Sequence, residues 1–170
     1  AIKLARLFGI TVLTTCGSDA KCIDALRVGA DHAINYRTQD FVAAVMELTG
    51  GRGVDLVLDM VAGDYVARNL KCLAEDGRHV TIAVQGGAKA EINMAQVMMR
   101  RYTLTGSTLR ARSDTFKALL AEEIQRNVWD MVGQGQLRPE MDRRFALVDA
   151  AAAHARMEAG DHIGKIVLEV

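Results

Sequence analysis

Hydrophobic positions in this chain follow two periods. Short aliphatic runs such as Val54–Asp59 (VDLVLD) predict strands covered on both faces. Between them, apolar residues recur every three or four positions, which predicts amphipathic helices. The predicted strands are Thr11–Thr15, His32–Asn35, Val54–Asp59, His79–Ala83, Tyr102–Thr108 and Lys165–Val170. The predicted helices are Ala1–Phe8, Asp19–Val28, Phe41–Leu48, Asp64–Leu73, Met94–Arg100, Asp114–Val132 and Asp149–Glu158.

This alternation predicts an α/β fold with one Rossmann-like, doubly wound parallel sheet. Such a sheet begins with a strand and a Gly-rich turn that binds pyrophosphate. No intact Gly-x-Gly-x-x-Gly occurs: Gly50–Gly53 precedes a strand and is interpreted as a loop, and Gly133-Gln134-Gly135 as a helix C-cap. The predicted sheet is therefore incomplete, without its first strand and Gly-rich loop. Because Ala1–Ala5 begins as though a helix were under way, we expect a longer protein.

The segment Thr11–Tyr36 carries the most informative chemistry, as a strand, a small-residue turn, a helix and a second strand. An NAD pocket places an Asp or Glu after such a strand, to bind the ribose 2′-hydroxyl. This chain has Cys16-Gly17-Ser18 there, with Lys21 one turn further on. A hydroxyl and an ammonium suit a 2′-phosphate, so the pattern favours NADP(H). The alternative is that Ser18 only caps the helix and Lys21 lies in solvent.

Composition excludes several classes of function. The 170 residues are 50% hydrophobic, enough for one substantial core. Lys+Arg and Asp+Glu are both 21, so no global field favours nucleic acid. No run approaches the ~18 apolar residues of a membrane span. The three cysteines lack Cys-x-x-Cys spacing, which favours a cytoplasmic location and no metal site. The histidines lack ligand spacing and are interpreted as structural or exposed: His32, His79, His154 and His162.

A series of short motifs runs in order through nearly the whole chain. They are Gly17-Ser18-x-x-Lys21, Leu26-x-x-Gly29-Ala30, Ile34-Asn35-Tyr36-Arg37, Thr49-Gly50-Gly51-x-Gly53-Val54-Asp55, Asp59-x-x-x-Gly63, Leu73-Ala74-x-x-Gly77-Arg78, Gly106-Ser107-Thr108-Leu109-Arg110-x-Arg112, His154-x-x-Met157-Glu158 and Gly164-Lys165-Ile166-Val167-Leu168. In this order they resemble the nucleotide-binding half of the zinc-free medium-chain dehydrogenases/reductases. The resemblance is narrower to NADPH:quinone oxidoreductases of the zeta-crystallin and tumour-suppressor-inducible type.

The resemblance implies hydride transfer from NADPH to a quinone or related enone. Tyr36 would contact the 2′-phosphate or adenosine, unless it is a surface aromatic beside Arg37. The turn Met60–Gly63 would line the adenosine side through its backbone, and Asp59 would either line the same side or cap that turn. Ala83–Gly87 and Ser107–Arg110 would contact the nicotinamide half. The cofactor-binding residues implied are Gly17, Ser18, Lys21, Tyr36, Met60, Val61, Gly63, Ala83, Gly86, Leu109, Arg110 and Lys165.

No nucleophile–base pair is evident, so no catalytic side chain is predicted; in hydride transfer the cofactor carries the chemistry. Residues 1–160 are expected to form a partial NADP(H)-binding domain. Residues 161–170 would form a strand that returns to a groES-like substrate domain and lacks its usual partner here. This chain alone is expected to be inactive. The resemblance also implies a homodimer joined edge to edge through Tyr102–Thr108.

Two other functions stay open. One is a nucleotide-binding module without reductase activity, and NADPH turnover with a quinone by the full-length protein separates it from a reductase. The other is a methyltransferase-like Rossmann protein, because VDLVLD resembles a strand beside that type of site. Ser18, Lys21 and the Gly164-Lys165 ending speak against this last interpretation.

Overall fold

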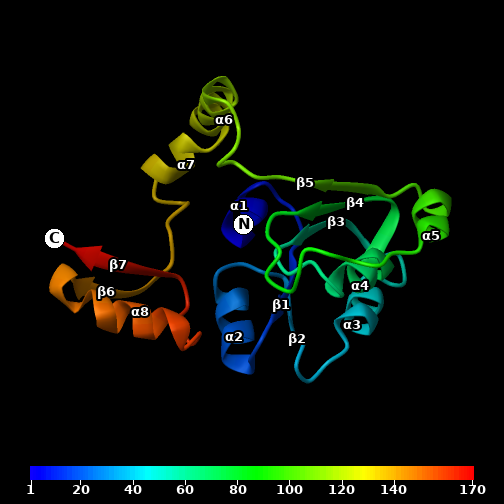
Figure 1. The fold of residues 1–170 in the computed structure, drawn as a ribbon, viewed down its shortest axis with the longest axis horizontal. Coiled ribbons are helices and arrows are strands. Elements are labelled where there is room, and N and C mark those ends of the chain that lie inside the picture. Colours follow the sequence, from blue (N-terminus) through cyan, green and yellow to red (C-terminus); the bar gives the residue numbers. More distant parts are fainter. The chain divides into compact units, whose positions relative to one another are not determined.

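The computed structural model describes residues 1–170, in which short parallel strands alternate with helices (Figure 1). The helices are α1 (Ile2–Leu7), α2 (Asp19–Arg27), α3 (Phe41–Leu48), α4 (Tyr65–Cys72), α5 (Met94–Met99), α6 (Asp114–Asn127), α7 (Trp129–Gly133) and α8 (Ala150–Glu158). The strands are β1 (Leu13–Cys16), β2 (His32–Asn35), β3 (Val54–Asp59), β4 (Leu73–Thr81), β5 (Thr103–Gly106), β6 (Met141–Ala146) and β7 (Lys165–Glu169). The predicted α/β class with parallel pairing is confirmed.

The strands form three separate sheets. Their orders are β1-β2, β3-β4-β5 and β6-β7. The pairs β3–β4, β4–β5 and β6–β7 are all parallel. The doubly wound strand order places the first strand between the second and the fourth. The strands of this chain labelled β1, β2 and β3 correspond to the second, third and fourth strands of such a sheet. The strand that would lie between β1 and β3 is not among the strands of this chain. The strands of this chain therefore do not join into the one continuous sheet predicted above.

By their internal contacts the residues divide into two compact units. Unit 1 contains Ala1–Thr14, Ser18–Ala33 and Leu119–Val170. Unit 2 contains Thr15–Gly17 and Ile34–Ala118. The predicted division at residue 160 stays a prediction.

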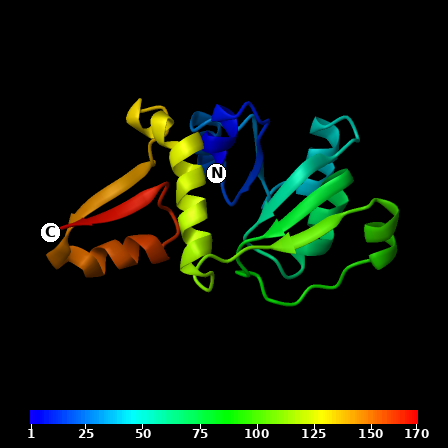
Figure 2. The same cartoon turned by 90° about the horizontal axis from the view of Figure 1, so that it is seen from above.

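The core of unit 2 lies where α4 meets the sheet β3–β5. Leu70, Leu73 and Tyr102 are buried at its centre, and the Tyr102 hydroxyl donates to the Leu73 carbonyl oxygen at 3.1 Å. Partly buried side chains pack around them: Val54, Val57, Val66, Ile92 and Val97. Figure 2 shows the three strands of this sheet side by side. Because they are parallel, their carboxyl ends share one edge, and the loops that follow them meet there.

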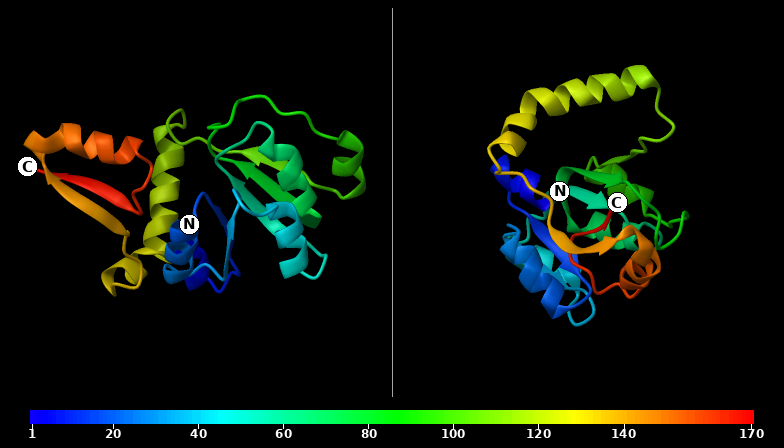
Figure 3. Two further views of the ribbon diagram at one scale, coloured as in Figure 1. Left: turned by 90° about the horizontal axis from the view of Figure 1, so that it is seen from below. Right: turned by 90° about the vertical axis from the view of Figure 1, so that its left-hand side faces the viewer.

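Unit 1 gives the last strand a partner inside this chain. β7 pairs with β6, and α8 lies beside both strands (Figure 3). Asp142 of β6 accepts two hydrogen bonds from Arg156 of α8, at 2.9 and 3.1 Å, and one from the Ile163 amide at 3.0 Å. These bonds, the Arg156 contact first among them, lower the pKa of Asp142 to about 2. β7 therefore has a partner strand within this chain, and its return to a groES-like substrate domain stays a prediction.

Two further elements differ from the pattern. The predicted helix Asp114–Val132 is interrupted at Val128 and forms α6 and α7. The Asn127 side-chain amide donates to the Glu123 carbonyl oxygen at 2.9 Å, a local bond that competes with the helix ladder. β4 begins at Leu73 instead of His79, directly after α4, because fully buried Leu73 pairs with Val54 before a register shift. None of the helices has both the length and the apolar character needed to cross a membrane.

Candidate functional site

The loop that follows β3 is fixed by one buried carboxylate. Asp59, the last residue of β3, is 4% exposed. Its Oδ1 accepts from the Val61 amide at 2.7 Å and from the Ala62 amide at 3.0 Å. The interpretation that Asp59 caps the following turn is confirmed. The cap holds Ala62 at a positive φ of 57°, so the backbone bends sharply at the carboxyl edge of the sheet.

The second oxygen of this carboxylate binds a histidine. Asp59 Oδ2 lies 3.0 Å from Nε2 of His79, which belongs to β4 and is 2% exposed. Removing both groups from water is favourable only when each satisfies the other's hydrogen-bonding capacity. His79 therefore serves the loop through Asp59, which agrees with its interpretation as a structural residue.

The loops after β3 and β4 meet backbone to backbone. The Gly86 amide donates to the Val61 carbonyl oxygen at 2.6 Å, and the Gln85 amide to the Met60 carbonyl oxygen at 3.2 Å. Gly63 has a φ of +54°, and a Cβ built on it would lie 2.5 Å from the Gly86 carbonyl oxygen. Only glycine allows this approach. Four predicted residues, Met60, Val61, Gly63 and Gly86, are thus brought together where the two loops pack against each other, with Gly63 buried and Met60 and Gly86 exposed.

Gly17 and Tyr36 are also brought together. The Tyr36 amide donates to the Cys16 carbonyl oxygen at 3.1 Å, which ties the end of β2 to the end of β1. A Cβ built on Gly17 would lie 2.8 Å from the Tyr36 hydroxyl. The phenol therefore reaches across the α-carbon of Gly17, and a larger residue there would displace it. Both residues belong to unit 2.

An aromatic column, formed by Phe41, Tyr65 and Arg68, supports Tyr36. The Tyr36 and Tyr65 rings meet edge to face, 6.4 Å between centroids. Tyr65 stacks on Phe41 at 5.6 Å, and the Arg68 guanidinium lies 4.1 Å from the Phe41 centroid. Sequence reasoning missed this column. Its members come from α3 and α4, and only an aromatic at the first position of each helix marks them in the sequence.

Three of the other predicted residues lie in the other unit. Ser18, Lys21 and Lys165 belong to unit 1. Ser18 Oγ accepts from the Lys21 amide at 3.3 Å, which confirms the N-cap of α2. The Lys21 ammonium is not simply solvated, because it donates to the Gly160 carbonyl oxygen. Lys165 begins β7, and its amide donates to the Glu140 carbonyl oxygen at 2.8 Å.

The last three predicted cofactor-binding residues, Ala83, Leu109 and Arg110, lie in the loops that follow β4 and β5. Ala83 follows β4, and the Ile82 amide before it donates to the Asp59 carbonyl oxygen at 2.7 Å. Leu109 and Arg110 are exposed in the loop after β5. That loop leaves the sheet with the Ser107 amide bonded to the Thr81 carbonyl oxygen at 3.0 Å. All three predicted residues therefore lie at the carboxyl edge of β3–β5.

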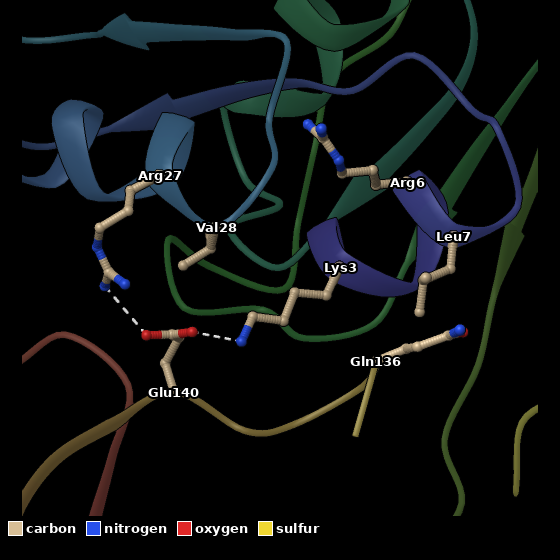
Figure 4. A pocket seen from close by; sticks show the side chains of 7 residues that line it. All are labelled: Lys3, Arg6, Leu7, Arg27, Val28, Gln136 and Glu140. Atoms are coloured by element: carbon tan, nitrogen blue, oxygen red, sulfur yellow. Dashed lines mark hydrogen bonds and ion pairs between the residues drawn. The ribbon is translucent and has the colours of Figure 1, made fainter. Parts of the chain in front are cut away.

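A cavity of about 440 Å³ lies in unit 1 and contains none of the predicted cofactor residues (Figure 4). Glu140 stands between Lys3 and Arg27, with Arg27 Nη2 at 3.0 Å from its carboxylate. The hydrogen bonds from these two cations, Lys3 first, lower the pKa of Glu140. The cavity is lined by Lys3, Arg6, Leu7, Arg27, Val28, Gln136 and Glu140. Two of its three basic groups, Lys3 and Arg27, are held by the Glu140 carboxylate, which is a structural arrangement.

Comparison with known proteins defines the class. Residues 28–168 match the zinc-binding dehydrogenase family, and the chain belongs to this family. Its fold is that of the family's Rossmann-type cofactor-binding domains: Escherichia coli quinone oxidoreductase complexed with NADPH superposes with a TM-score of 0.82 over 99% of this chain and 52% of that one, at 26% identity.

Two curated relatives are similar in sequence over nearly the whole chain. The 2-haloacrylate reductase of a Burkholderia species is 33% identical over 171 residues, which cover 98% of this chain and 50% of that protein. A phenolphthiocerol/phthiocerol polyketide synthase of Mycobacterium tuberculosis is 31% identical over 174 residues, 100% of this chain and 8% of that protein. The chain thus spans half or less of the length of these relatives.

Proposed function

We propose that this chain is the NADPH-binding part of a reductase that transfers a hydride to a quinone or a related electron-poor alkene. The observation that carries the proposal is the Gly17–Tyr36 contact, in which a phenol hydroxyl stands beside the residue that follows β1, while neither β1 nor β2 ends in an acidic residue. An acid at this place would bind a ribose 2′-hydroxyl and repel a 2′-phosphate. The arrangement therefore suits NADPH better than NADH.

The loops at the carboxyl edge of the sheet lie where the remainder of such a cofactor would bind. Ligands of doubly wound sheets bind outside the carboxyl ends of the strands. There, Gly63 and Gly86 let the loops after β3 and β4 pack closely, and Met60 and Gly86 stay exposed at the place where the cofactor would lie. When bound, NADPH supplies the hydride, and the acceptor also takes up one proton. The residues of this chain hold and orient the cofactor.

The similarity to a quinone oxidoreductase and to a 2-haloacrylate reductase supports an electron-poor alkene as the hydride acceptor. Quinones and 2-haloacrylates share a carbon–carbon double bond conjugated to a carbonyl or carboxylate, which accepts a hydride at carbon. The polyketide synthase match makes a polyketide chain the second candidate acceptor. We further propose that the protein acts as a homodimer through β5, whose four residues are exposed and which pairs only with β4.

The test uses the product of the complete reading frame that encodes this chain. NADPH oxidation is followed by absorbance with 1,4-benzoquinone, with 2-chloroacrylate and with a crotonyl thioester. We expect turnover with at least one acceptor and none with the isolated 170-residue chain. Tight NADPH binding without turnover on any of them would favour a binding module instead. Binding of S-adenosylmethionine in preference to NADPH would favour a methyltransferase.

A further inference from the structure

Arg112 has no part in the cofactor site described above. It lies in the loop that follows β5 and leads into α6 (Figure 1). The second mononucleotide-binding half of a doubly wound sheet is built on its last three strands, which correspond to β3–β5 here. The family resemblance assigns Ser107–Arg110 of the same loop to the nicotinamide and gives Arg112 no role. Arg112 therefore follows directly on the residues expected at the reacting end of the cofactor.

A turn and a helix cap fix the place of Arg112. Its amide donates to the Leu109 carbonyl oxygen at 3.1 Å. The next residue, Ser113, caps α6, because its Oγ accepts from the Phe116 amide at 3.3 Å. The cap brings the Phe116 ring to Arg112, whose guanidinium carbon lies 5.1 Å from the ring centroid, within the range of a cation–π contact. All of these residues belong to unit 2.

The ring holds the guanidinium without neutralising it. Phe116 is 44% exposed, so the contact lies at the surface, where a ligand can reach it. Arg112 takes part in none of the ion pairs of this chain. A carboxylate matches the planar guanidinium with two parallel hydrogen bonds. No internal carboxylate has to be displaced when such a ligand binds to Arg112.

The surroundings of Arg112 are positive as well. Residues 107–113 contain two arginines, Arg110 and Arg112, and no acidic residue. In the first turn of α6 the charges cancel, because Lys117 pairs with Asp114 at 3.7 Å. The loop after β5 therefore attracts an anion to the edge of the sheet where the hydride acceptor would lie.

An acceptor with a carboxylate on its double bond makes the most use of this cation. Hydride addition to C3 of an acrylate forms the new C–H bond, and the π electrons move to C2 and onto the carboxylate. A proton taken up at C2 then gives the saturated acid. Because the charge on the carboxylate grows during hydride transfer, a guanidinium beside it stabilises the transition state more than the ground state. An acceptor that starts uncharged depends on the cation less.

We propose that Arg112 is a specificity-determining residue that binds the carboxylate of the hydride acceptor, and that Phe116 is the positioning residue that holds its guanidinium. The inference rests on the proposed function. It narrows the class of acceptor to an electron-poor alkene that carries a carboxylate.

The experiment compares 2-chloroacrylate with 2-chloroacrylamide, which has the same alkene without the charge, in the complete protein at saturating NADPH. The quantity measured is the charge ratio, defined as kcat/KM for the acrylate divided by kcat/KM for the amide. Arg112→Met should lower kcat/KM for the acrylate about 10- to 100-fold and leave that for the amide, and KM for NADPH, within about threefold. Arg112→Lys keeps the charge but loses the planar fork, so it should recover only part of the ratio.

Variants of Phe116 test the positioning role. Phe116→Leu should lower the charge ratio about 3- to 10-fold, because the guanidinium loses the ring that holds it. Phe116→Tyr keeps a ring and should keep the ratio. Its effect being as large as that of Phe116→Leu overturns the role of the ring.

Two controls each remove a cation of the same unit that already has a partner. Arg52→Met removes an exposed arginine that pairs with Asp55. Lys117→Met removes the lysine next to Phe116 that pairs with Asp114. Neither should change the charge ratio.

A wild-type protein that reduces the amide at least as efficiently as the acrylate, or that reduces 1,4-benzoquinone and neither of these two, overturns this inference and leaves the proposed function standing. Equal losses on both acceptors in Arg112→Met also overturn it, because they indicate a structural role for Arg112. A wild-type protein that binds NADPH and reduces no acceptor overturns the proposed function and the inference with it.

Discussion

Replacing Asp59 by alanine removes the group on which the loop after β3 depends. Its carboxylate accepts three hydrogen bonds within a buried site: from Val61, from Ala62 and in the pairing with His79. Alanine supplies no acceptor for any of them. Asp59→Asn keeps an oxygen for the two amides and presents an N–H toward the imidazole, so it is the milder variant.

The expected cost follows from what is left without a partner. An unsatisfied buried donor costs about 1–3 kcal/mol. The Val61 amide is only partly buried, so water can replace its bond, whereas the Ala62 amide and the His79 ring are buried. The Ala62 amide and the His79 ring are therefore both left without a partner, at about 1–3 kcal/mol each. We expect Asp59→Ala to lower the free energy of unfolding by about 3–5 kcal/mol, and Asp59→Asn by about half as much.

The assay is urea unfolding of the 170-residue chain followed by far-ultraviolet circular dichroism, with amide hydrogen exchange of Val61 and Ala62 as the local readout. Asp55→Ala is the matched control, because Asp55 lies on the same strand but is exposed and pairs only with Arg52. If Asp59→Ala and Asp55→Ala lower the unfolding free energy equally, or if the Val61 and Ala62 amides keep their protection in Asp59→Ala, the anchoring role of Asp59 is refuted.

Three further predictions concern other parts of the chain. Burial raises the pKa of the Cys72 thiol from 9.0 to about 11. At pH 8, iodoacetamide should therefore modify Cys72 roughly 100-fold more slowly than an ordinary cysteine. Modification of Cys72 as fast as that of Cys22 would contradict this prediction. The Asp142 pKa falls from 3.8 to about 2 on folding, so its pairing with Arg156 stabilises the chain above pH 3.8, and this stabilisation is lost as the pH falls through 2. Arg156→Gln should therefore lower stability at pH 6 and lower it much less at pH 2. An equal loss at both values would show that charge is not involved. Thr105→Pro removes a donor from the β5 edge and should shift the complete protein from dimer to monomer in light scattering, whereas an unchanged mass would locate the interface elsewhere.

The features that the sequence predicts well are those whose causes lie within a few residues. VDLVLD forms a strand with the predicted bounds, and the Asp at its end caps the next turn, because both depend on local periodicity and local hydrogen bonds. The end of α6 is not predictable from periodicity. The apolar spacing continues through Val128, and the interruption comes with a side-chain bond from Asn127 to the backbone.

Tertiary pairings cannot be predicted in the same way. Tyr36 and Tyr65 are separated by a helix and a strand, so their edge-to-face contact follows only from the packing of α3 and α4. From the sequence, His79 is expected to be structural or exposed, but its partner cannot be predicted. The partner depends on the register between β3 and β4, which the sequence of neither strand determines by itself. A polar residue inside a buried strand does signal that a partner exists, and here that partner is Asp59.

Cofactor discrimination by the complete protein tests the central claim most directly. The measurement is kcat/KM for NADPH and for NADH at saturating acceptor, with the quinone or alkene that gives the fastest turnover. We predict at least a roughly 10-fold preference for NADPH, because a phenol and a guanidinium stand at Gly17 where an NAD-dependent protein has a carboxylate. Equal efficiency with both cofactors, or a preference for NADH, would contradict it.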